Sequence, residues 1–235
     1  MRRALRLLLL VLLALGCHAS ACARGFFQAM CEDHMKPPVA LVKSELNGYS
    51  INNAVSFRQL PSLSHAPPAG NGFVLGLTVT KYGARIAYRT NTMRNPISRY
   101  ECATFEIEVK MAYEPTVIYV GKEFVPGTCA YGEILAHEMR HLKTYFEQLP
   151  KVETVVRGAL ERRFAVKAMY GPAGQAEQAL KREIEQVWGP YFDAEMKKAD
   201  RAHDVIDTPQ EYARLSRVCQ GEVQSFIAPA APLNR

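Results

Sequence analysis

The segment from residue 136 to residue 141, AHEMRH, contains the arrangement H-E-x-x-H. Residues four apart on an α-helix lie on one face, so His137 and His141 can direct their imidazoles toward one point. Zinc binds neutral imidazole nitrogen at about 2.0–2.1 Å and, in catalytic sites, uses three protein ligands and one water. Glu138 lies one residue further round the helix, where its carboxylate can take a proton from that water. The spacing therefore predicts Zn²⁺ ligands at His137 and His141 and a general base at Glu138.

An ordinary amphipathic helix with two surface histidines is the alternative interpretation of this segment. Arg140 and Lys143 favour the alternative, because zinc peptidases usually keep these positions uncharged. The uncharged residues 134–136 before the motif favour the zinc site. We expect zinc binding.

A third zinc ligand is expected from the helix predicted to begin at Tyr191. Six of its residues fall on one stripe at helical spacing, namely Phe192, Glu195, Met196, Ala199, His203 and Ile206. We expect His203 to be the ligand, because Asp207 follows one turn later and could accept its second ring N–H. Glu195 is the alternative third ligand, since a buried carboxylate on an apolar face is costly unless paired. Without a metal, Glu195 would form a salt bridge and His203 would be a hydrogen-bonded core residue.

The residues from Val39 to Val120 have the pattern of β-strands. Residues 72–90 contain two apolar runs joined at Tyr82 and Gly83, which predicts a hairpin. Residues 102–113 alternate apolar and charged side chains, and residues 116–120 form a further short apolar run. We expect a small, mainly antiparallel sheet.

The chain after Thr128 has helical periodicity. We expect a helix from an N-cap at Thr128 to Pro150 and a second helix over residues 151–170. A third is expected over residues 173–206, interrupted at Gly189 and Pro190. Thr208 and Glu211 form a capping box that begins a last helix. Strands followed by helices predict an α+β fold, with one domain over residues 24–227 and a disordered tail over residues 228–235.

The first 23 residues have the order of a secretory signal peptide, with Arg2 and Arg3 before an apolar run and small residues. The mature chain would begin at Arg24 and be periplasmic or secreted; lipoprotein processing at Cys17 is the alternative. Cleavage leaves four cysteines, which suits two disulfides in an oxidising compartment. We expect Cys102 to pair with Cys129, and Cys31 with Cys219.

The charge of the chain gives little support for nucleic-acid binding. Loss of Arg2, Arg3 and Arg6 with the signal peptide lowers the net charge from +6 to +3, and the remaining basic residues are scattered. No apolar run in the mature chain has the length of a transmembrane helix. We expect no nucleic-acid partner and no membrane span in the mature protein.

The segments at residues 133–145, EILAHEMRHLKTY, and 202–212, AHDVIDTPQEY, resemble the zincin class of zinc peptidases, and more narrowly an uncharacterised bacterial family of secreted predicted zinc-dependent proteases. The resemblance implies a zincin-like helix pair beside a small sheet, with an edge strand that binds extended substrate. Residues 116–120 are expected to be this strand. Metzincins continue the motif with glycine and histidine, where this chain has Thr144 and Glu147. Gluzincins instead take a glutamate from a later helix, a position that Glu195 could fill.

The sequence and the resemblance together predict a periplasmic or secreted zinc-dependent metallohydrolase. Its most natural activity is that of a peptidase, and its partner is a peptide or protein substrate, which could be envelope-associated. The alternative is a non-catalytic zinc-binding interaction module of the envelope on a zincin-like scaffold. A third interpretation is a zinc-binding accessory protein that acts on cell-wall material.

Overall fold

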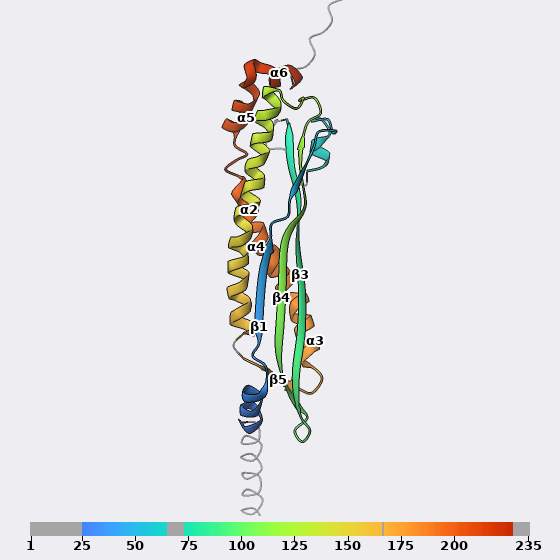
Figure 1. Ribbon diagram of the computed structural model, residues 1–235, viewed down its shortest axis with the longest axis vertical. Helices are drawn as coiled ribbons and strands as arrows, with labels where there is room; N and C mark the ends of the chain where they lie inside the picture. The colour runs from blue at the N-terminus through green and yellow to red at the C-terminus, as the bar shows by residue number, and fades with distance from the viewer. Residues whose placement is uncertain (1–24, 65–72, 166, 228–235) are drawn as a thin grey trace, which may run out of the picture. The chain divides into compact units, whose positions relative to one another are not determined.

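The computed structural model of the chain describes residues 25–64, 73–165 and 167–227 (Figure 1). The predicted signal peptide and the predicted tail after residue 227 lie outside these residues. The α+β fold is confirmed, with strands that precede most of the helices. The strands are β1 (Val39–Glu45), β2 (Tyr49–Asn52), β3 (Gly76–Asn95), β4 (Tyr100–Val120) and β5 (Met169–Pro172).

Most of the helices follow β4 in the chain. The α-helices are α2 (Cys129–Phe164), α3 (Ala176–Glu183), α4 (Gly189–Asp200), α5 (Pro209–Arg217) and α6 (Glu222–Ile227). Short turns of other helix types cover Leu60–Ser62, Ile184–Trp188, Arg201–His203 and Cys219–Gly221. A further helix covers residues 25–34. Within the described residues, no helix has the length and apolar character that a membrane span requires.

Strand β4 is the centre of the sheet, because β1, β2, β3 and β5 all pair with it. The expectation of a mainly antiparallel sheet is wrong for β2, which pairs with β4 in parallel from Tyr49 opposite Thr116 to Asn52 opposite Tyr119. Strand β5 pairs with β4 antiparallel. The parallel pairing is possible because the chain runs through β3 between β2 and β4 and so returns in the same direction.

Two predicted chain breaks are absent, one in β3 and one in α2. Strand β3 continues through Tyr82 and Gly83, and the turn follows at residues 96–99. Gly83 has no positive φ, which a two-residue hairpin there would need. Helix α2 continues through Pro150. Buried Leu149 and Val156 extend its apolar stripe, and their burial outweighs the one hydrogen bond that proline cannot donate.

The described residues form two compact units. The first unit contains residues 25–41, 86–108, 157–165 and 167–189, and the second contains residues 42–64, 73–85, 109–156 and 190–227. Because β3, β4 and α2 each contribute to both units, the predicted single domain over residues 24–227 stays a prediction. In the second unit, a cluster that includes Phe57, Phe124, Ile134 and Val223 forms a core around the start of α2.

Two disulfides are present, as expected, but the predicted pairing is wrong. Cys31 pairs with Cys102 in the core of the first unit, and Cys129 pairs with Cys219 in the second unit. Four cysteines allow three pairings, and only the tertiary fold selects between them. The second bond attaches the start of α2 to the turn before α6.

Candidate metal centre

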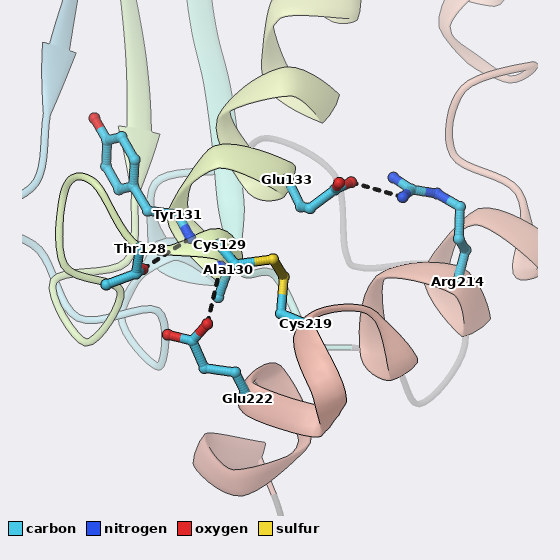
Figure 2. The surroundings of a disulfide bond; sticks show 8 residues. All are labelled: Thr128, Cys129, Ala130, Tyr131, Glu133, Arg214, Cys219 and Glu222. Atoms are coloured by element: carbon cyan, nitrogen blue, oxygen red, sulfur yellow. Dashed lines mark hydrogen bonds and ion pairs between the residues drawn. A yellow bond between two sulfur atoms is a disulfide. The ribbon is translucent and has the colours of Figure 1, made fainter.

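Helix α2 carries the H-E-x-x-H residues and is fixed firmly at its start. Thr128 is the N-cap, as predicted, and accepts a hydrogen bond from the backbone N–H of Tyr131 at 3.3 Å (Figure 2). The Glu222 carboxylate accepts from the N–H of Ala130 at 3.0 Å, beside the disulfide of Cys129. These contacts hold the first turn of α2 against the C-terminal segment. The motif follows two turns later.

The two histidines of the motif are buried and converge. His137 and His141 are 4% and 8% exposed, which contradicts the interpretation of a solvated face with two surface histidines. Their Nε2 atoms lie 3.2 Å apart, as expected for side chains four residues apart on one helix face. The carboxylate of Asp207 completes the group, with Oδ1 3.2 Å from Nε2 of His137 and 3.3 Å from Nε2 of His141. We call these three residues the triad.

The triad has the donor set and spacing of a metal site. Its three ligand atoms all lie within 4.8 Å of one another. A tetrahedral zinc ion about 2.0–2.1 Å from its ligands places neighbouring ligand atoms about 3.3–3.4 Å apart. The three separations in the triad, 3.2, 3.2 and 3.3 Å, are close to that value. Two imidazoles and a carboxylate therefore fit three of the four positions around one such ion.

The expected third ligands, His203 and Glu195, lie outside the triad, so their role as zinc ligands stays a prediction. Helix α4 ends at Asp200, and His203 lies on the 3₁₀ turn that follows. The predicted stripe assumed a continuous α-helix through residue 206, whereas the α-helix ends before His203. Glu195 is buried on α4, where its Oε1 forms an ion pair with Lys198 Nζ at 2.6 Å.

His203 instead contacts the outer nitrogen of His141. The two Nδ1 atoms lie 2.9 Å apart and the rings are stacked. Burial and the neighbouring His141 lower the pKa of His203 to about 4, so this ring is neutral near pH 7. A neutral His203 can accept the Nδ1–H of His141 and thereby fix the tautomer in which Nε2 of His141 has a free lone pair.

The Nδ1 atom of His137 lies beside a carboxylate, just as the Nδ1 atom of His141 lies beside His203. Glu211 Oε1 lies 3.3 Å from Nδ1 of His137, and Arg140 Nη2 lies 2.9 Å from the same nitrogen. Glu211 also forms ion pairs with Arg140 and Arg214. Despite burial, the hydrogen bonds from Arg214 and Arg140 lower the pKa of Glu211 to about 2, so the group is ionised. Arg214 also donates to Glu133 at 2.7 Å, which connects α5 to α2 (Figure 2). The charge of Arg140, which counted against a zinc site in the sequence, is thus balanced by Glu211.

Asp207 is held in its ionised form. Burial raises the pKa of this carboxyl group, but the hydrogen bonds from His137 and His141 outweigh it and the net pKa is lowered. The Tyr212 hydroxyl donates to the same Oδ1 at 3.0 Å. Thr208, the predicted N-cap of α5, follows directly and accepts from the N–H of Glu211. The start of α5 therefore positions both the carboxylate of Asp207 and the carboxylate of Glu211, which contacts His137.

Glu138 lies between α2 and the first residues of β3. Its carboxylate is buried, and Oε2 accepts a hydrogen bond from Thr78 Oγ1 at 2.9 Å. Gly76 is close enough that a Cβ there would come within 2.8 Å of Oε1 of Glu138. Burial raises the pKa of Glu138, although both motif histidines and Thr78 act in the opposite direction. A carboxylate with a raised pKa can both accept and return a proton at neutral pH.

A cavity of about 570 Å³ opens over the triad and Glu138. Residues 73–78 line one side, and Tyr145 and Tyr212 are also in its wall. The expected substrate-binding edge, residues 116–120, is wrong, because this part of β4 pairs with β2 on one side and contacts β3 on the other, where Gly121 N donates to Leu75 O. The strand at the cavity is β3, which pairs with β4 alone among the described strands.

Three contacts of the site were not predicted from the sequence. They are the contact of Asp207 with both motif histidines, the hydrogen bond from Thr78 to Glu138, and the contact of Glu211 with His137. The sequence predicts Asp207 as a partner for His203 and Glu211 as half of a capping box. Their position directly at the start of a predicted helix, in the segment D-T-P-Q-E, was the available signal. Thr78 gave none.

Comparisons with known proteins returned nothing similar: no family model, no curated protein and no solved structure matches the chain.

Proposed function

We propose that this protein is a zinc-dependent hydrolase, most naturally a peptidase, that acts in an oxidising compartment outside the cytoplasm. The observation that carries the proposal is the triad of His137, His141 and Asp207 beside the buried carboxylate of Glu138, all facing one cavity. The two disulfides support export, because such bonds persist in secreted and periplasmic proteins.

The triad would hold the ion, and each member has a partner that fixes it. Glu211 and His203 contact the outer nitrogens of His137 and His141, and Tyr212 donates to Asp207. Outer partners of this kind orient ligands and are worth about 10–100-fold in metal affinity. Bound zinc supplies Lewis acidity, which polarises a carbonyl and acidifies water.

Glu138 has the role of proton carrier in this proposal. Its carboxylate takes a proton from the attacking water as the new C–O bond forms. It then returns that proton to the leaving amine as the C–N bond breaks, so the residue ends as it began. The hydrogen bond from Thr78 holds Oε2, which leaves the carboxylate in one orientation.

An extended peptide is the substrate that the cavity suits best. Residues 73–78, which include the first residues of β3, line the cavity, and a peptide can add to the edge of a strand through backbone hydrogen bonds. A peptide bound along this edge would pass the triad and Glu138.

The test is metal content of the exported protein together with activity on an unbiased peptide library. We expect one zinc per chain and cleavage that is lost in Glu138→Gln while zinc is retained. Glu147→Gln is the matched control, because Glu147 is an exposed glutamate on the same helix. No zinc, as purified or after titration, would exclude the proposal. Zinc without any cleavage would support the alternative, a non-catalytic zinc-binding module of the envelope.

A further inference from the structure

A second, smaller cavity adjoins the metal centre in the same unit. Its volume is about 260 Å³, and its wall contains Thr80, Tyr82, Tyr113, Tyr145, Asp193, Met196, Lys197 and Asp200. We call it the tyrosine pocket. Tyr145 and Asp200 also line the cavity over the triad, so the two spaces share a wall. A ligand bound at the triad could therefore extend a side chain into the tyrosine pocket.

Three aromatic rings surround the tyrosine pocket. The ring of Tyr113 lies 4.8 Å from that of Tyr145 and 6.4 Å from that of Tyr82, measured between centroids. The hydroxyl oxygen of Tyr82 is buried and has no hydrogen-bond partner within the described part of the chain. Aromatic faces attract cations, and an unpaired hydroxyl oxygen can accept a hydrogen bond from an ammonium or guanidinium group.

The charged side chains of the pocket favour a positive ligand. Asp193 and Asp200 contribute two carboxylates against the single ammonium of Lys197, all from α4. Burial raises the pKa of the Tyr82 hydroxyl, and the negative charge of the Asp193 carboxylate raises it further. Burial also raises the pKa of Asp200, although Lys197 opposes the shift. A cation in this pocket would compensate carboxylates that Lys197 only partly neutralises.

The size of the pocket limits the ligand to one side chain. Sites for drug-sized molecules occupy about 300–1,000 Å³ and bury most of the ligand. The tyrosine pocket is smaller, and its wall combines apolar ring faces with acidic ends. A lysine or arginine side chain has the matching form, since an apolar stem leads to a cationic head.

We propose that the tyrosine pocket is a specificity subsite that binds a lysine or arginine side chain of a peptide held at the metal centre. The proposal rests on the proposed function for its peptide substrate, but binding of the basic side chain can be measured without hydrolysis. The enzyme would then prefer peptides with a basic residue beside the bond that is cut.

The binding experiment compares N-acetyl-lysine methylamide with its norleucine isostere in titrations followed by tyrosine NMR signals. Zinc-loaded Glu138→Gln protein serves as host, so that nothing is hydrolysed. We expect the lysine compound to bind about tenfold more tightly. Asp193→Asn should remove most of this preference, and Tyr82→Phe should reduce it. Asp33→Asn, which removes an exposed carboxylate in the other unit, should leave it unchanged.

Equal affinity of the two compounds for the host protein would overturn the proposal. So would a lysine preference that survives in Asp193→Asn, provided that circular dichroism shows the variant folded. If cleavage is found, the ratio of kcat/KM for lysine and norleucine peptides should follow the same order in the same variants. If no peptide is cleaved, the proposed peptidase function fails, while the binding titration still decides the subsite.

Discussion

Removal of Asp207 should empty the metal centre, whereas removal of His203 should only weaken it. The Oδ1 atom of Asp207 lies 3.2 and 3.3 Å from the two Nε2 atoms, at the position of a direct ligand. His203 contacts Nδ1 of His141, which is the ring nitrogen that does not face the triad. We therefore expect His203 to affect a bound metal only through His141. Outer partners cost about 10–100-fold in metal affinity when mutated, so we expect His203→Ala to fall in that range.

Asp207→Ala should exceed that range, with a loss of about 10³-fold or more, which corresponds to about 4 kcal/mol. It removes both a ligand and the negative charge that faces the two imidazoles. The assay is competition for zinc between the protein and a chromogenic chelator at fixed pH. Asp204→Ala is the matched control, because Asp204 is an exposed carboxylate in the same cavity wall but outside the triad. It should change zinc affinity little.

Protein stability has to be separated from metal affinity in this comparison. Asp207 also accepts the hydroxyl of Tyr212, so its loss leaves that hydroxyl without this acceptor. Tyr212→Phe keeps Asp207 and removes only this hydrogen bond, so it measures how much of the loss in zinc affinity comes from the hydrogen bond. Thermal unfolding of each zinc-free variant shows whether the fold persists. A site that stays filled in folded Asp207→Ala but is emptied by His203→Ala would refute our assignment and restore the ligand first expected from the sequence.

Three further predictions concern the base, the pH dependence and the second disulfide. Thr78→Val should keep zinc but lower kcat on cleaved peptides by about tenfold, because it removes the hydrogen bond that orients Glu138; an unchanged kcat would mean that Thr78 has no positioning role. Burial lowers the pKa of His137, but its hydrogen bond to Asp207 and the charge of Glu138 outweigh burial, so the net pKa lies above the ordinary 6.5. Protons compete with zinc for this imidazole, and chelator competition should show zinc affinity falling as pH drops through that raised pKa; a constant affinity down to about pH 5 would contradict this. Cys129→Ser should lower the free energy of unfolding in denaturant by about 2–5 kcal/mol, and a loss below about 0.5 kcal/mol would show that this bond does not stabilise the fold.

The fold class and the motif could be predicted from the sequence because both depend on local periodicity. Alternation gave the strands, and the four-residue spacing of His137 and His141 needed only one helix. The continuation of α2 through Pro150 could not be predicted, because the local rule that proline ends a helix was overcome by side chains that are buried only in the folded chain.

The third member of the triad was missed for a related reason. A helical stripe assigns side chains to faces only while the helix keeps 3.6 residues per turn. After Asp200 the chain forms a 3₁₀ turn, and it is Asp207 that contacts both motif histidines at Nε2, while His203 contacts Nδ1 of His141. The prediction of the disulfide pairing failed because the pairing depends on which segments, distant in the sequence, meet in the folded chain.

The bond between Cys129 and Cys219 closes a covalent ring that contains His137, Glu138, His141 and Asp207, together with the residues that orient them on α5. A single backbone cut within this ring, whether by another protease or by the protein itself, would leave every piece of the metal centre attached to the others. Separation of these residues into different molecules would require two cuts, or one cut and reduction of the bond. In an environment rich in proteases, the ring would keep these four residues of a nicked molecule covalently linked to one another.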